Sequence, residues 1–201
     1  MSRIYITLAV EDALSEAVVR KMLDQSERNY QVMNCLSKGG YGYLKKKINA
    51  FNQAAKATPF FVLTDQDRGC PPEKIRNWLK HKLNPNLIFR IAVMEVESWV
   101  MAHRQAFAQF ASLPVQRIPH NTDAIKNPKE SLLAIVSKSR SKRLKEAIVP
   151  KRGSTAQIGP DYNAQLSQFI RTSWDVYEAK KNSASLERAF NRIQLFEPTF
   201  M

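Results

Sequence analysis

The sequence has few of the features that stabilise secreted proteins or anchor membrane proteins. Its two cysteines, Cys35 and Cys70, stand in no CxxC or Cys/His arrangement, which argues against a disulfide framework and against a zinc site. No run approaches the roughly 18 apolar residues that a membrane span needs, and the first residues lack the pattern of a signal peptide. We therefore expect a cytoplasmic protein that makes no membrane contact.

Several common nucleotide-binding and hydrolase motifs are also missing. There is no GxxxxGK[ST] loop, so the chain is not expected to be a P-loop ATPase itself. The Gly-Tyr-Gly segment at 40–42 lacks the third glycine of a dinucleotide-binding fingerprint, and there is no GxSxG nucleophile elbow. These absences exclude three familiar enzyme classes.

Acidic residues are in the minority. The 201 residues include 31 Lys and Arg but only 18 Asp and Glu, which gives a net charge of +13. Such an excess attracts polyanions through a long-range field and counterion release, so nucleic acid, either DNA or tRNA, is the leading partner. A surface charge that only keeps the protein in solution is the alternative explanation.

Basic residues concentrate between residues 138 and 152, where seven of them accompany a single acid, Glu146. Phosphate groups are the natural counterpart of such a run, and the solvated face of a helix explains part of it equally well. The predicted nucleic-acid contacts are Lys138, Arg140, Lys142, Arg143, Lys151 and Arg152.

In the first half of the chain, segments with the pattern of strands alternate with segments of helical spacing. Strands are predicted at 4–10, 30–36, 60–63 and 87–94. Gly39, Gly40 and Gly42 predict a loop before the second helix, and after the fourth strand and the segment 95–99 a helical stretch is predicted to run to about Phe110. The alternation predicts an α/β fold with a mostly parallel four-stranded sheet and helices on both faces.

The character of the sequence changes after residue 112. Prolines and loops come first, and helical patterns then appear at 132–136, 162–170 and 186–193 without a convincing strand between them. Their apolar residues are spaced to bury one face of each helix. We therefore predict an α/β domain over residues 1–112 and a helical C-terminal region over 113–201 that packs on it.

Acidic residues follow three of the predicted strands. Glu11 comes after the first strand, Asp65 and Asp67 after the third, and Glu95 and Glu97 after the fourth. In open α/β sheets ligands bind outside the carboxyl ends of the strands, and clustered acids repel one another unless a cation neutralises them. The arrangement therefore predicts a divalent-metal site. Taken singly, each of these acids is more often a turn or helix-start residue.

The metal that suits such a site is Mg²⁺, or Mn²⁺, because these hard cations prefer carboxylate, water and phosphate oxygens. The chemistry that follows is metal-assisted phosphodiester hydrolysis. Lys129, Lys151 or Arg152 would neutralise charge on the phosphate. The predicted ligands of the first ion are Glu11, Asp65 and Asp67, and Glu95 and Glu97 complete that ion or hold a second one.

Glu11 after the first strand and Asp65-Gln66-Asp67 after a later strand stand in an order that resembles the TOPRIM domain of topoisomerases, primases and overcoming-lysogenisation-defect nucleases. In that superfamily such a glutamate and DxD motif hold magnesium. A closer similarity, to a bacterial group of TOPRIM-like proteins, covers nearly the whole chain. It rests on the segments 10–16, 39–44, 63–72, 95–99, 127–130, 159–163 and 183–186.

This resemblance implies a Rossmannoid TOPRIM-like fold and an Mg²⁺-dependent endonuclease. Members of the closer group are similar to nuclease effectors encoded beside AAA-type ATPases in bacterial anti-phage systems, which implies an ATPase partner and a role in defence. One departure is Asp12, because the TOPRIM pattern usually has glycine after the glutamate. The departure is compatible with metal binding and makes topoisomerase or primase chemistry doubtful.

Two other functions remain compatible with these residues. One is a non-catalytic module that binds nucleic acid or an ATPase partner and uses the acids only to place a structural ion. The other is a phosphotransfer or nucleotide-sugar enzyme that uses the DxD motif on a small substrate. The sequence leaves open whether the substrate is DNA or RNA and whether the chain forms a homodimer.

Overall fold

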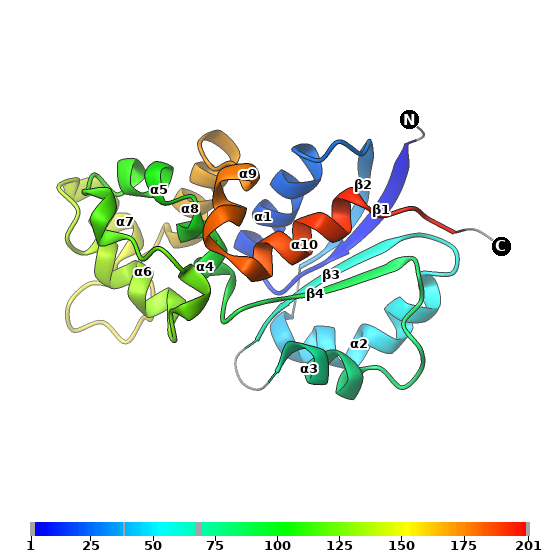
Figure 1. Ribbon diagram of the computed structural model, residues 1–201. Coiled ribbons are helices and arrows are strands. Elements are labelled where there is room, and N and C mark those ends of the chain that lie inside the picture. The colour runs from blue at the N-terminus through cyan, green and yellow to red at the C-terminus, as the bar shows by residue number, and fades with distance from the viewer. Residues whose placement is uncertain (1–2, 38, 67–69, 200–201) are drawn as a thin grey trace.

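Four parallel strands form the centre of the structure (Figure 1). The computed structural model describes residues 3–37, 39–66 and 70–199. All three pairs of neighbouring strands are parallel, which confirms the predicted α/β fold with a four-stranded sheet. In the order β2-β1-β3-β4 the strands are β2 (Tyr30–Leu36), β1 (Ile4–Ala9), β3 (Phe60–Asp65) and β4 (Leu87–Ala92).

Two helices, α2 (Gly40–Ala54) and α3 (Pro71–Trp78), cover one face of the sheet and lie below it in Figure 1. Leu44 and Ile48 are four residues apart, so both point from α2 to the sheet. They are fully buried in a core with Val62 of β3, and Trp78 of α3 joins the same core. The helical spacing of apolar residues in α2 and the alternation of side chains in β3 thus bring both sets of side chains into one core.

The opposite face is covered by α1 (Ala13–Asp24) and α10 (Ala184–Gln194), which come from the two ends of the described chain (Figure 1). Ile6 and Leu8 of β1 and Ile88 of β4 are buried in the core beneath these helices. Beyond α10, the chain is held at the start of β4. There the side-chain amide of Asn86 donates to the Thr199 carbonyl oxygen at 2.7 Å and accepts from the Thr199 amide at 2.8 Å.

The remaining helices extend this second core beyond the sheet. Trp99 and Phe169 are buried in it, and α8 (Tyr162–Thr172) packs directly on α1. The helices predicted at 132–136, 162–170 and 186–193 are confirmed, whereas the division after residue 112 stays a prediction. These elements are α4 (Val96–Ala102), α5 (Arg104–Phe110), η1 (Val115–Arg117), η2 (Thr122–Ala124), α6 (Pro128–Val136), α7 (Lys142–Ile148), α8 (Tyr162–Thr172), α9 (Val176–Ala179) and η3 (Lys180–Asn182).

One local prediction was wrong. Gly40 and Gly42 do not form a loop but lie in the first turn of α2, and Gly39 before them has a φ of 113°, which favours glycine. The helical stretch predicted to run to about residue 110 is confirmed, with an interruption at His103, whose φ of −78° and ψ of 70° separate α4 from α5. The imidazole Nδ1 of His103 accepts from the Asp175 amide at 2.9 Å. Within the described ranges no helix is long and apolar enough to cross a membrane.

Candidate metal centre

Three neighbouring strands bring acids to one edge of the sheet. β3 lies between β1 and β4, and because all three run in the same direction their carboxyl ends meet at that edge. Asp65 is the last residue of β3, Glu11 follows β1, and Glu97 lies in the first turn of α4, after β4. Acids that follow different strands in the sequence therefore lie close together in the structure.

Glu11 links the ends of β1 and β3. Its Oε1 accepts a hydrogen bond from the Asp65 backbone amide at 2.9 Å and another from the Thr64 hydroxyl. These bonds connect residues more than 50 positions apart in the chain. They hold the Glu11 carboxylate beside the end of β3.

The carboxyl group of Asp65 is strongly perturbed by its surroundings. Burial raises its pKa well above the usual value, and the negative charges of Glu97, Glu11 and Asp12 raise it further. A hydrogen bond from the Val96 amide to Asp65 Oδ1, at 2.9 Å, opposes this shift. Burial and repulsion outweigh this hydrogen bond, so the pKa of Asp65 is raised. A nearby cation would stabilise its ionised carboxylate.

Glu97 is almost completely buried, with 1 % of its surface exposed. Its Oε1 accepts from the Tyr162 hydroxyl at 2.8 Å and lies 3.6 Å from Lys129 Nζ. Burial raises the pKa of Glu97, and Lys129 and Tyr162 oppose the rise. The other oxygen, Oε2, is buried and has no hydrogen-bond partner within the described part of the chain. A buried carboxylate oxygen without a donor is costly and is the atom that a metal ion would satisfy.

Glu95 has a different neighbour. Its Oε2 accepts from the backbone amide of Lys129 at 2.7 Å, in the first turn of α6. Negative charge is stabilising there because the first amides of a helix have no intrahelical acceptors. Glu97 is therefore the stronger candidate ligand, while Glu95 joins α6 to the cluster.

Lys129 brings a positive charge to the acids. Burial lowers its pKa, but the charges of Glu97 and Glu95 outweigh this effect, helped by Asp65 and Asp12, and the net pKa is raised. The ammonium therefore stays protonated at neutral pH, as its predicted role opposite a phosphate requires. Lys129 thus places a positive charge beside Glu97 and Glu95.

The fit of the cluster to a metal ion is incomplete within the described residues. No group of three or more His, Cys, Asp or Glu side chains among them lies close enough together to hold an ion. Asp67, the second acid of the DxD motif, lies outside the described residues. The orphaned Glu97 Oε2 and the crowding at Asp65 fit a cation, and the metal ligands stay a prediction.

Asp12, the departure from the TOPRIM pattern, has a structural task. Its Oδ1 accepts from the Ser15 amide at 2.8 Å and caps the N-terminus of α1. An aspartate at this position thus starts the helix that follows Glu11. Its charge also acts on Asp65 and Lys129, so it belongs to the electrostatics of the cluster.

Lys74 was not among the predicted site residues. Its side chain is buried in α3 and donates to the backbone carbonyl oxygens of Asp65 and Gln66, the latter at 2.9 Å. It also lies over the rings of Tyr41 and Trp78, at 4.7 and 5.4 Å from their centroids. The signal in the sequence is its spacing, because Lys74 is one helical turn before Trp78 and hence on the same buried face.

The predicted nucleic-acid contacts lie on the surface of the helical region. Lys142 and Arg143 belong to α7, and Lys151 and Arg152 follow in the segment between α7 and α8. No described hydrogen bond or ion pair joins Lys151 or Arg152 to the acid cluster, in contrast to Lys129. The six exposed residues of this set are Lys138, Arg140, Lys142, Arg143, Lys151 and Arg152.

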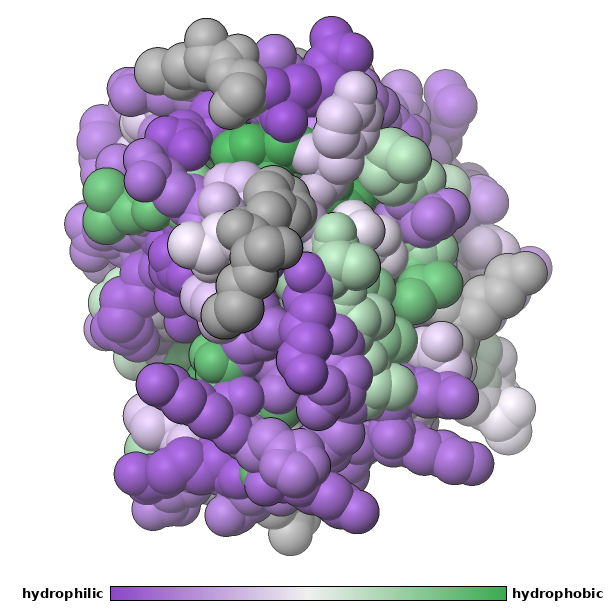
Figure 2. Space-filling model, turned by 90° about the vertical axis from the view of Figure 1, so that its right-hand side faces the viewer, coloured by the Kyte–Doolittle hydropathy of each residue, from purple (hydrophilic) through white to green (hydrophobic). Residues whose placement is uncertain are grey.

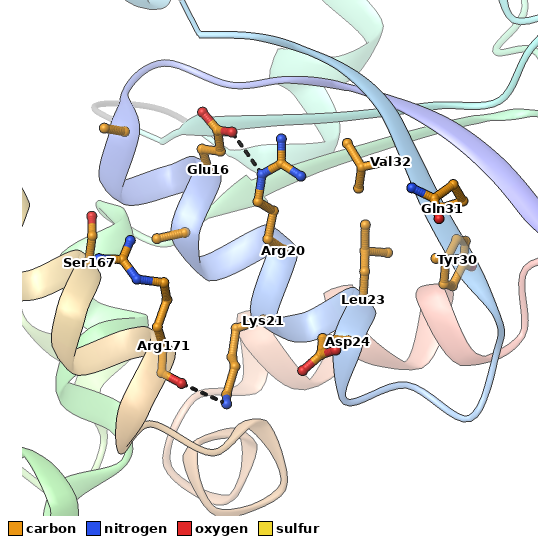
Figure 3. Close-up of a pocket in the computed structure, with 12 residues that line it drawn as sticks. Glu16, Arg20, Lys21, Leu23, Asp24, Tyr30, Gln31, Val32, Ser167 and Arg171 are labelled. Atoms are coloured by element: carbon orange, nitrogen blue, oxygen red, sulfur yellow. Dashed lines mark hydrogen bonds and ion pairs between the residues drawn. The ribbon is translucent and has the colours of Figure 1, made fainter.

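A cavity of about 610 Å³ adjoins the cluster at Glu95. Lys45, Lys74 and Lys126 are among its lining residues, so basic groups line the approach to the acids. A second cavity, of about 600 Å³, lies between α1, β2 and α8 (Figure 3). There Arg20 pairs with Glu16 at 2.8 Å, so its charge is already neutralised. The first cavity is the better candidate entry for a phosphodiester.

The comparisons with known proteins place the chain in a family by sequence. No curated protein and no solved structure matches it. One family model, described as "Domain of unknown function (DUF4276)", matches residues 10–170, which include the whole sheet edge and Tyr162. The chain belongs to this DUF4276 family.

Proposed function

We propose that the chain is a metal-dependent nuclease that hydrolyses phosphodiester bonds of DNA or RNA. The observation that carries the proposal is the buried Glu97 Oε2, which has no hydrogen-bond donor among the described residues, beside an Asp65 whose pKa is raised by burial and by its acidic neighbours. Structural acids normally avoid both conditions, because each costs folding free energy. Functional sites are where such costs are tolerated.

Glu11, Asp65 and Glu97 are the residues that would hold Mg²⁺ or Mn²⁺, together with Asp67. When bound, such an ion lowers the pKa of an attacking water and stabilises the leaving oxygen of a phosphodiester. The chain itself orients the acids through the bonds from Thr64 and Tyr162. Lys129, held protonated next to Glu97, would attract the substrate phosphate to the edge.

The biological setting of the proposal rests on the resemblance. We propose an effector of bacterial anti-phage defence that works with an AAA-type ATPase in the cytoplasm, as a monomer or as a homodimer. The net charge of +13 supports a polyanionic substrate but does not distinguish DNA from tRNA.

The decisive experiment is a nuclease assay with plasmid DNA, single-stranded DNA and tRNA in Mg²⁺ or Mn²⁺, with and without a cognate ATPase. We expect cleavage by the wild type and loss of cleavage in Asp65→Asn and Glu97→Gln, which remove charge and keep shape. Glu187→Gln, the same type of change at an exposed position of α10, is the matched control and should cleave normally. Cleavage that survives in EDTA or in Asp65→Asn would overturn the proposal.

The second candidate is a non-catalytic binding module, and one observation favours it. Glu11, Asp65 and Glu95 each accept a hydrogen bond from a backbone amide, so each has a structural use without any metal. This candidate predicts that Asp65→Asn binds nucleic acid as the wild type does and that neither protein cleaves it.

A further inference from the structure

A cavity of about 620 Å³ lies along β4, at the edge of the sheet away from β2. Its walls come from α3 and α10, which Figure 1 shows on opposite sides of β4. Pro72 and Ile75 line it on one side, and Leu195, 76 % exposed, lines it on the other. Small-molecule sites are clefts of about 300–1,000 Å³ with mainly apolar linings and a few polar groups. The size and the apolar walls of this cavity agree with such a site.

Arg90 is the polar group in the strand that runs along this cavity. It stands between Ile88 and Ala92 in β4, and because side chains alternate in a strand all three point to the face covered by α10. Its two neighbours are buried in the core, whereas Arg90 is half-buried in the cavity wall. Its Nε is buried and has no hydrogen-bond partner within the described residues. Nη1 donates to the Phe89 carbonyl oxygen at 3.3 Å, and because a guanidinium carries five N–H donors, others are left for an anion in the cavity.

Two further arginines reach the same cavity from α10. Arg188 and Arg192 are four residues apart and so lie on one face of the helix. Burial lowers the pKa of Arg90 to about 10, and the charges of Arg192 and Arg188 contribute to the shift. No described ion pair joins any of the three to a carboxylate. Three unneutralised guanidiniums at one cavity repel one another, and an anion between them would remove that repulsion.

We propose that this arginine groove, formed by Arg90, Arg188 and Arg192 with the apolar walls at Pro72, Ile75 and Leu195, binds a free nucleoside phosphate. The planar guanidinium forks match phosphate oxygens, and the apolar walls suit a base. The groove is distinct from the lysine-lined cavity at Glu95, and the inference does not depend on nuclease activity. Binding requires no P-loop, because the phosphates would be held by side chains.

Isothermal titration of ATP into the protein in EDTA tests the proposal with the acid cluster kept free of metal. Inorganic phosphate should compete. We expect the double variant Arg188→Gln, Arg192→Gln to bind ATP about tenfold or more weakly. Lys46→Gln, Lys47→Gln is the matched control, since it removes two exposed positive charges from α2 and should bind as the wild type does.

Arg90→Gln supplies a second variant, and we expect the same loss of ATP affinity with a melting temperature no lower than that of the wild type, since the change removes one of three repelling charges. Asp65→Asn should bind ATP normally, which separates this inference from the nuclease proposal. The inference is overturned if the wild type gives no heat of binding with ATP at about 1 mM. It is also overturned if the arginine double variant and the lysine double variant lose ATP affinity equally. It is overturned as well if the arginine variants lose affinity for a 5′-phosphorylated oligonucleotide but not for ATP, because the groove then contacts a nucleic-acid strand.

Discussion

Asp65 is expected to destabilise the fold at neutral pH. Its folded-state pKa is raised, so the folded protein binds the proton more tightly than the unfolded chain does. Ionisation of Asp65 therefore lowers the free energy of unfolding. Asp65→Asn keeps the acceptor for the Val96 amide and removes the charge. We therefore expect the variant to have a higher free energy of unfolding than the wild type above the folded-state pKa. The difference should shrink as the pH falls through that pKa, as urea denaturation at pH 8 and pH 5 would show.

Asp161→Asn is the control for this experiment, because Asp161 is exposed and its side chain makes no capping bond to α8. Its effect should be small and the same at both pH values. A loss of stability in Asp65→Asn at pH 8 would contradict the expectation and would mean that the charge is needed for the fold.

Tyr162 provides the hydroxyl donor to Glu97, and its removal should be costly. Tyr162→Phe leaves the buried Glu97 Oε1 without that donor, so we expect a loss of about 1–3 kcal/mol in the free energy of unfolding. Tyr177→Phe is the matched control, since its hydroxyl bonds to the Gln25 carbonyl at an exposed position. The cost of Tyr162→Phe should change in a Glu97→Gln background. Equal costs in the two backgrounds would show that the two side chains are not coupled.

The sequence predicted those residues of the candidate site that lie at the ends of strands. Glu11 and Asp65 were identified because each comes after an apolar run whose end must lie at the carboxyl edge of the sheet. The choice between Glu95 and Glu97 was not predictable, because it depends on where α6 and α8 arrive from later in the chain. Lys74 was missed although its spacing to Trp78 places it on the buried face of α3, because its bonds to the backbone carbonyl oxygens of Asp65 and Gln66 depend on how α3 packs on the end of β3.

In the segment between α7 and α8, Gly159 lies against the backbone of α7. A Cβ on Gly159 would lie 2.4 Å from the Ala147 carbonyl oxygen, and the Gly159 amide donates to the Ile148 carbonyl at 2.8 Å. Gly159→Ala must therefore shift the start of α8, and we expect a loss of about 1–3 kcal/mol in the free energy of unfolding. Urea denaturation followed by circular dichroism would measure it.

Gly42→Ala is the matched control for this substitution. Gly42 lies in α2, and a Cβ there would meet nothing within 4 Å. Because alanine favours the helix, Gly42→Ala should stabilise the protein by about 0.5–1 kcal/mol. A neutral Gly159→Ala would show that α8 can move away from α7 without cost.

The strands were predicted better than the helix boundaries. The second strand has the predicted bounds, although it is only partly buried. The first and fourth strands end within two residues of the predicted positions, because largely apolar runs identify buried strands. The helix boundaries at Gly40 and at His103 depend on tertiary contacts instead. Glycine content alone suggested a loop at Gly40 and Gly42, yet the packing of Leu44 and Ile48 on the sheet extends α2 over both residues.

At the scale of the whole molecule, the positive charge should govern binding to nucleic acid. Figure 2 shows a largely hydrophilic face with hydrophobic residues in limited areas. If the basic run 138–152 binds phosphates, Lys142→Gln, Arg143→Gln should reduce the slope of log affinity against log salt concentration. On duplex DNA the expected reduction is about 0.9 for each phosphate that the variant no longer neutralises. Fluorescence anisotropy over a salt series would measure the slope.

Lys80→Gln, Lys82→Gln is the charge-matched comparison, with two exposed lysines removed from the segment between α3 and β4. It should leave the slope almost unchanged. Equal slopes for the two double variants would indicate that the net charge of +13, and not the run 138–152, attracts the nucleic acid.

The position of α10 has a consequence for the synthesis of the protein. This helix packs on β4 and shares a core with β1, although nearly the whole chain separates it from the first strand. Until α10 has been synthesised, the part of this face that α10 covers stays open, and the Ile88 side chain of β4 faces water or a chaperone. Only when residues 184–199 emerge can Thr199 reach Asn86 and the last layer close. The fold is therefore completed late. A ribosome that stalls before α10 would release an incomplete sheet whose exposed apolar residues favour aggregation.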